Sequence, residues 1–169
     1  VETIGAACFR SCPVLESFTF EEGSKLTSIA QNAFGECPTL KNVTIPASVK
    51  TIGMECFAWC RALESVTFEK GSKLTTIGNK LFYACYALKS ITIPASVETI
   101  GEYCFYCCTA LESVTFEEVS KLTSIAQKAF GECPALKSIT IPASVETIGE
   151  FCFAYCYALE SVTFEKGSK

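Results

Sequence analysis

The sequence repeats itself every 48 residues, and this periodicity constrains the fold more than any other feature. The segments ETIGAACF, KTIGMECF, ETIGEYCF and ETIGEFCF begin at Glu2, Lys50, Glu98 and Glu146. A shorter period lies within it, because isoleucine recurs with spacings that alternate between 25 and 23 residues, at positions 4, 29, 52, 77, 100, 125 and 148. Fixed periods of this length indicate a solenoid, in which each repeat packs only against its neighbours. We therefore expect about seven stacked coils of two alternating types.

Each coil predicts one strand and one short helical turn. The motif L-x-x-V-x-F at residues 63–68 places alternate apolar side chains on the same face of a strand. The other recurring segment, I-G-x-x-C/A-F-x-x-C, has Cys56, Phe57 and Cys60 at i, i+1 and i+4 in the coil of residues 63–68. This spacing is typical of one face of a helical turn.

The combined pattern C-x-x-L-x-x-I-x-I-P-x-x-V-x-x-I-G-x-x-x-F-x-x-C closely resembles the BspA-like class of leucine-rich repeats, over essentially the whole chain. These repeats occur in surface proteins of bacteria and parasitic protists. The resemblance implies an α/β solenoid, a right-handed arc with parallel strands on the concave face and short helical turns on the convex face. It also implies a cell-surface or extracellular location and adhesion to host cells or matrix proteins, and it supplies no catalytic residues.

The whole chain, residues 1–169, is expected to be a single solenoid segment without caps. Val1 aligns with Val49 in mid-coil, and Lys169 is equivalent to Lys73. Solenoids need polar terminal coils to close their cores. We therefore expect a part of a longer array, and we expect the isolated chain to associate end to end, because each open end exposes apolar side chains and unpaired strand edges.

Two absences exclude most catalytic and metal chemistry. The chain has no histidine, and all of its 18 acidic residues are glutamate. Nucleophile systems with an imidazole and most zinc, haem and calcium sites are thereby excluded. The 14 basic residues are scattered and the net charge is -4, which argues against nucleic acid as a partner. No apolar run approaches the roughly 20 residues that a membrane-spanning helix needs. We predict a protein that is not an enzyme and carries no cofactor.

Eleven of the twelve cysteines fall into two rows of equivalent positions. One row holds Cys12, Cys37, Cys60, Cys85, Cys108, Cys133 and Cys156, and the other holds Cys8, Cys56, Cys104 and Cys152. Either row could hold metal or disulfides, since stacked coils lie about 4.8 Å apart. We favour small core side chains instead, because Ala33, Leu81 and Ala129 replace the second row. We predict buried, reduced, metal-free thiols and one more reactive group, Cys107, outside both rows.

Two polar rows are interpreted as structural. Glutamate and lysine alternate at Glu16, Lys41, Glu64, Lys89, Glu112, Lys137 and Glu160. Such exposed pairs contribute about 0.2–1 kcal/mol each, which disfavours stacking two coils of one type. Threonine is constant at positions 19, 44, 67, 92, 115, 140 and 163. This row could bind ice or glycans, but threonine also suits a stacked parallel strand.

The aromatic residues of the predicted helical turns are the candidate partner-binding residues: Trp59, Tyr83, Tyr86, Tyr103 and Tyr106, with Phe151, Tyr155 and Tyr157 further along. Gly131, Glu132 and Pro134 separate the two groups. Tryptophan and tyrosine are enriched among interface hot spots. The alternative is that these rings pack on neighbouring coils and shield the layer beneath.

Two functions follow from these observations. The first is a non-enzymatic, protein-binding adhesion array that contacts host or matrix proteins. The second is an intracellular or filament-forming scaffold that self-associates. The twelve cysteines are compatible with it, because a core of this size does not need disulfides.

Overall fold

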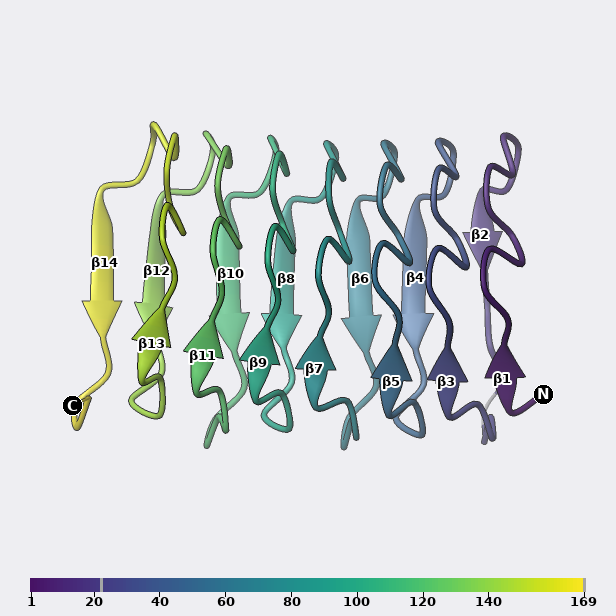
Figure 1. Ribbon diagram of the computed structural model, residues 1–169, viewed down its shortest axis with the longest axis horizontal. Coiled ribbons are helices and arrows are strands. Elements are labelled where there is room, and N and C mark those ends of the chain that lie inside the picture. Colours follow the sequence, from purple (N-terminus) through teal and green to yellow (C-terminus); the bar gives the residue numbers. More distant parts are fainter. Residues whose placement is uncertain (22, 169) are drawn as a thin grey trace.

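Alternation of apolar and hydroxyl residues gives each coil one strand of a seven-stranded parallel sheet (Figure 1). The computed structural model describes residues 1–21 and 23–168. The strands are β2 (Ser17–Phe18), β4 (Asn42–Ile45), β6 (Ser65–Phe68), β8 (Ser90–Ile93), β10 (Ser113–Phe116), β12 (Ser138–Ile141) and β14 (Ser161–Phe164). In β4 the valine and isoleucine are buried while the asparagine and threonine are exposed, as the period of two requires. We call this side of the molecule the strand face.

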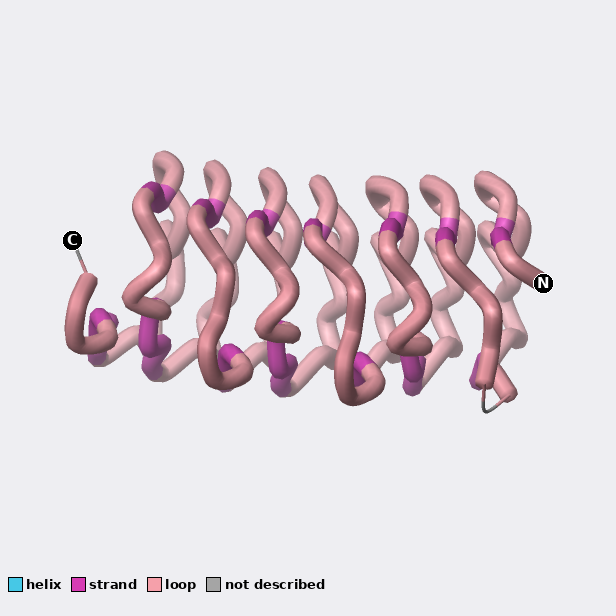
Figure 2. Tube along the Cα trace, turned by 90° about the horizontal axis from the view of Figure 1, so that it is seen from below, coloured by secondary structure: helices cyan, strands magenta, loops and turns pink. Residues whose placement is uncertain are grey.

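A second parallel ladder, which the sequence did not predict, lies at the recurring isoleucine. It has two parts, a three-stranded and a four-stranded sheet, with a break between the strands at Ile52 and Ile77. Its two-residue strands are β1 (Thr3–Ile4), β3 (Ser28–Ile29), β5 (Thr51–Ile52), β7 (Thr76–Ile77), β9 (Thr99–Ile100), β11 (Ser124–Ile125) and β13 (Thr147–Ile148). Each coil therefore has two strands. The coils are residues 1–25, 26–48, 49–73, 74–96, 97–121, 122–144 and 145–169, and Figures 1 and 2 show them in a nearly straight row.

The expected helical turns are wrong, because no helix occurs among the described residues (Figure 2). The segments concerned are residues 5–13, 30–38, 53–61, 78–86, 101–109, 126–134 and 149–157, and we call their side of the molecule the turn face. Alternate amides donate to the next coil, such as Phe57 N–H to Leu81 O over 3.0 Å and Trp59 N–H to Tyr83 O over 2.8 Å. The amides between them close tight turns within their own coil, such as Ala58 N–H to Glu55 O over 3.1 Å. Two residues per segment, such as Glu55 and Trp59, take a left-handed φ of 56° and 62°. Consecutive tight turns with inter-coil hydrogen bonds replace the helix.

The core is a stack of equivalent side chains along the solenoid axis. Leu63 and Val66 are buried as predicted, while Phe68 is half-buried. A phenylalanine row links all seven coils with ring-centroid distances of 5.1 to 5.8 Å, at positions 9, 34, 57, 82, 105, 130 and 153. Offset aromatic stacking of this kind adds to the burial energy of each ring.

The coils associate in pairs. Four residue pairs join β4 to β6, β8 to β10 and β12 to β14, whereas one or two join the intervening strands. Within each pair, a glutamate after the second strand accepts a hydrogen bond from the amide of an alanine in the preceding coil, as Glu69 does from Ala47 over 3.0 Å. Glu117 and Glu165 repeat this contact. The 48-residue sequence period therefore corresponds to a two-coil structural unit.

The junction between coils 49–73 and 74–96 is the most weakly paired. Here β6 and β8 share one residue pair, and β5 is not paired with β7. At the equivalent junctions Ala30 and Ala126 donate their amides to Ile4 and Ile100, but Gly78 forms no such bond within the described chain. The phenylalanine spacing also reaches its maximum of 5.8 Å here.

Candidate protein-interaction surface

The side chains of the turn face are positioned by the two left-handed residues of each turn segment. The first is at positions 7, 32, 55, 80, 103, 128 and 151, and the second at positions 11, 36, 59, 84, 107, 132 and 155. Left-handed residues cost about 1–2 kcal/mol each. The inter-coil hydrogen bonds on both sides offset this cost, so each row stays aligned from one coil to the next.

Five predicted aromatic residues form one continuous cluster over three coils. The Trp59 ring centroid lies 5.4 Å from that of Tyr83 and 6.3 Å from that of Tyr86. Tyr106 stacks on Tyr83 at 5.6 Å and meets Tyr103 edge-on at 5.4 Å. Trp59 is 38% exposed, while the four tyrosines are half-buried. Packing between coils therefore buries part of the surface of the four tyrosines, and Trp59 has the most accessible ring.

Tyr106 contacts the next coil, where Gly131 and Glu132 were expected to interrupt the aromatic surface. A Cβ added to Gly131 would lie 3.0 Å from the Tyr106 ring, so a larger residue there would displace the ring by a few tenths of an ångström. The Tyr106 hydroxyl donates a hydrogen bond to Glu132. This bond raises the pKa of Tyr106 and, together with a hydrogen bond from Cys107, lowers the pKa of Glu132. Gly131 and Glu132 therefore support the cluster and do not end it.

Lysine and arginine side chains lie over several rings. The Lys128 ammonium lies 5.4 Å from the Tyr103 centroid and 5.6 Å from that of Phe151, and so connects the two predicted aromatic groups. Arg61 lies 5.7 Å from the Trp59 centroid and 5.9 Å from that of Tyr86. Cation–π contacts at exposed sites contribute about 0.5–1 kcal/mol.

The second group lies on the last coil and is more exposed. Phe151 is 61% exposed, Tyr155 59% and Tyr157 82%, with 6.3 Å between the two tyrosine rings. All eight predicted residues thus lie on the turn face, in a band that Lys128 makes continuous.

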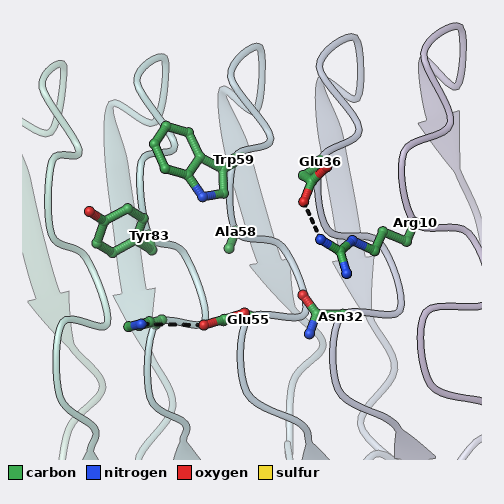
Figure 3. Close-up of a pocket in the computed structure, with 8 residues that line it drawn as sticks. Arg10, Asn32, Glu36, Glu55, Ala58, Trp59 and Tyr83 are labelled. Atoms are coloured by element: carbon green, nitrogen blue, oxygen red, sulfur yellow. Dashed lines mark hydrogen bonds and ion pairs between the residues drawn. The ribbon is translucent and has the colours of Figure 1, made fainter.

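Two hollows border Trp59. One, of about 470 Å³, is lined by Glu36, Pro38, Trp59 and Arg61. The other, of about 300 Å³, is drawn in Figure 3, where the indole nitrogen is at the edge of the ring nearest Ala58. Two ion pairs, Arg10 with Glu36 and Lys80 with Glu55, cross this second hollow. These pairs could not be predicted from the sequence, since their partners are 26 and 25 residues apart.

The pattern of coils and turns has a direct counterpart among known sequences. The BspA type leucine-rich repeat region matches the chain in six copies, over residues 1–91 and 75–169. The chain belongs to the BspA-type leucine-rich-repeat family. No curated protein sequence matches this BspA-type chain at a significant level.

Solved structures of bacterial proteins are similar to this solenoid. The pneumococcal vaccine antigen PcpA is 29% identical with a TM-score of 0.74, and the match covers 99% of this chain and 37% of PcpA. A leucine-rich-repeat protein from Bacteroides capillosus is 33% identical with a TM-score of 0.52, over 73% of this chain and 76% of that one. The T. pallidum leucine-rich-repeat protein is 23% identical with a TM-score of 0.59, over 86% and 77%, and supports the fold alone.

The cysteine rows of this BspA-type solenoid lie mostly in the core. In the first row each thiol from Cys37 onward donates to the phenylalanine carbonyl of the preceding coil, at sulfur–oxygen distances of 3.1 to 3.2 Å. Burial raises the pKa of Cys60 and of Cys152 to about 12. All twelve thiols are free. The row therefore supplies a small side chain that also binds a buried carbonyl, which alanine cannot do.

Cys107 differs from the prediction that it would be the chief reactive thiol. It is half-buried and donates to Glu132 over 3.1 Å. Burial, followed by this hydrogen bond, raises its pKa to about 12. These contacts disfavour the thiolate of Cys107, which is the reactive form of a cysteine. Cys8, in the second row, is the exposed thiol.

The two polar rows lie on or beside the strand face. Lysines 41, 89 and 137 pair with the glutamates one coil earlier, at nitrogen–oxygen distances of 3.1, 3.4 and 3.2 Å. Thr92 and Thr115 share a hydrogen bond of 2.9 Å between hydroxyls. Both rows thus form contacts between coils, as the structural interpretation predicts. No group of three or more Cys or Glu residues in the described chain is arranged to hold a metal ion, and no helix there could span a membrane.

Proposed function

We propose that this chain is a non-enzymatic protein-binding array that acts at the cell surface or outside the cell and adheres to host cells or matrix proteins through its turn face. The observation that carries the proposal is the continuous aromatic band from Trp59 to Tyr157, with Trp59 accessible at its start. Large rigid rings supply contact area at low entropic cost and dominate interface hot spots.

Family membership supports the same reading. Leucine-rich-repeat solenoids are binding scaffolds in general, and a vaccine antigen of pneumococcus shares this fold over 99% of the chain. Since the chain spans only 37% of that antigen, adhesion stays a proposal for this segment. The filament-forming scaffold is the weaker candidate, because no observation on the turn face requires a second copy.

The test is binding of the purified chain to cultured epithelial cells and to immobilised extracellular-matrix proteins. Trp59→Ser combined with Tyr86→Ser removes two rings that form no side-chain hydrogen bond in the described structure. Loss of one hot spot costs about 2 kcal/mol or more, so we expect affinity to fall at least about thirtyfold.

The matched control is Thr67→Ala with Thr92→Ala on the strand face. It should bind as the natural chain does. Full binding by the ring-deleted variant, with the melting temperature unchanged, would show that the turn face is not the contact surface. Loss of binding only in the threonine variant would place the contact on the strand face.

A further inference from the structure

Two hollows on the turn face are built from equivalent positions. The first is lined by Glu36, Pro38, Trp59 and Arg61. The second, of about 380 Å³, is lined by Thr109, Glu132, Pro134, Tyr155 and Tyr157. Glutamate, proline and an aromatic ring recur at the same places 96 residues later, which is two 48-residue periods. The molecule thus presents the same recess twice along one line parallel to its axis.

The separation of the two recesses matches one kind of extended peptide. Four coils separate them, and at about 4.8 Å per coil this is roughly 19 Å. A polyproline II helix rises about 3.1 Å per residue with three residues per turn, so six residues span roughly 19 Å and bring a side chain back to the same face. Two coils therefore correspond to one turn of such a peptide.

The chemistry of the recesses suits this conformation. Each combines an aromatic ring with a proline, which are the flat apolar surfaces that proline rings pack against. A polyproline II backbone has no internal hydrogen bonds, so its carbonyls need donors. At the first recess, the indole N–H of Trp59 and the guanidinium of Arg61 are available, because neither donates a side-chain hydrogen bond to another described residue.

Small residues occupy one row of positions between the two recesses. The equivalent positions of the two intervening coils hold Ala84 and Cys107, which are buried and half-buried. In the adjacent row, Tyr86 lies against Trp59, with ring centroids 6.3 Å apart, and Arg61 lies over both rings. A peptide that spans both recesses would therefore cross the row of Ala84 and Cys107 beside the Tyr86 ring.

We propose that the turn face binds a proline-rich segment of a partner protein in the polyproline II conformation, with prolines six residues apart in the Trp59 and Tyr155 recesses. This inference rests on the proposed function, since it names the kind of protein segment that the aromatic band recognises. A preformed polyproline II segment loses little entropy on binding.

The test uses acetylated, amidated nonaproline, with triproline and a nine-residue Gly/Ser peptide for comparison. Trp59 is the only tryptophan, so its fluorescence reports on the first recess directly. Nonaproline should shift the emission and bind at least about tenfold more tightly than triproline, because it reaches both recesses at once. The Gly/Ser peptide should leave the emission unchanged.

Variants separate the two recesses. Tyr155→Ser with Tyr157→Ser should reduce nonaproline binding to the triproline level while the Trp59 response to triproline is kept. Trp59→Ala, followed by calorimetry, should weaken nonaproline binding at least about tenfold. Met54→Ser is the control, because Met54 is 48% exposed in the Trp59 coil but lines neither recess.

Three outcomes would overturn the proposal: no response to nonaproline at millimolar concentration, equal affinity for both proline peptides, or a response to a neutral hexasaccharide in place of nonaproline. Each would leave the proposed function intact if the ring-deleted variant still loses cell or matrix binding.

Discussion

At the residue scale, one backbone position contradicts the pattern of its own repeat. Val119 has a φ of 58°, in the place where Gly23 and Gly71 have φ values of 77° and 79°. A β-branched residue is strongly disfavoured in this conformation. Val119 is also 91% exposed, so its side chain contributes almost no packing energy.

Val119→Gly should therefore stabilise the protein. Relief of left-handed strain contributes about 1–2 kcal/mol, and the greater freedom of glycine in the unfolded chain removes about 0.4–1 kcal/mol of it. Urea unfolding should show a net gain of up to about 1.6 kcal/mol. Val14→Gly is the control, since Val14 is 85% exposed without a positive φ, and it should not stabilise. A loss of stability in Val119→Gly would mean that the valine is not strained.

At the element scale, Leu81 explains the weak junction between coils 49–73 and 74–96. It is fully buried, at the position where the other 23-residue coils have Ala33 and Ala129. A leucine in a slot where the other 23-residue coils have a methyl group needs more room, and the separation falls on the side of coil 49–73, since coil 74–96 is fully paired with coil 97–121. Gly78 then lacks the inter-coil hydrogen bond that Ala30 and Ala126 form.

Leu81→Ala should be tolerated unusually well. A buried Leu→Ala change costs about 2–5 kcal/mol, but here closure of the junction would restore hydrogen bonds that contribute about 0.5–1.5 kcal/mol each. We expect a loss below about 2 kcal/mol and slower hydrogen exchange at the Gly78 amide. Leu88→Ala, at a buried position that is leucine in every coil, should show the full cost. An equal loss of stability in both variants would show that Leu81 does not hold the two coils apart.

The turns and the pairing of coils show how far the sequence predicts the elements. The 23- and 25-residue periods predicted the coils, and alternation predicted the core position of Val66. The spacing of Cys56, Phe57 and Cys60 fits a helix and a pair of tight turns equally well. What decides is the amide partner, and for Phe57 it is Leu81, 24 residues away. Contacts between coils, such as that of Tyr106 with Glu132, also join residues far apart in the sequence, so a periodic pattern does not predict them.

At the scale of the whole molecule, both terminal coils present apolar side chains at their open faces. At the first coil, Ile4, Phe9, Phe18 and Phe20 line a hollow of about 410 Å³. At the last coil, Val162 is 38% exposed, whereas its equivalent Val114 is 5% exposed. A second copy stacked in register would place its Val1 coil against the coil that ends at Lys169, and so would continue both ladders.

The glutamate–lysine row opposes this stacking. The seven coils begin and end with a glutamate in that row, so Glu160 of one copy would meet Glu16 of the next. Glu16 is already paired with Lys41, and Lys137 is paired with Glu112, which leaves Glu160 without a lysine partner among the described residues. Like charges directly opposite each other on neighbouring strands are destabilising.

Glu160→Lys should therefore strengthen end-to-end association, because it replaces a repulsion by an attraction. Each of these contributions is about 0.2–1 kcal/mol, so the association constant should rise between about twofold and thirtyfold at low salt, and less at high salt. Sedimentation equilibrium measures this directly. Glu150→Lys is the matched control, since it changes the net charge equally in the same coil but would face Ala6 of the second copy. Equal association of the two lysine variants would show that net charge alone acts, and a decrease in Glu160→Lys would show that the copies do not stack in register.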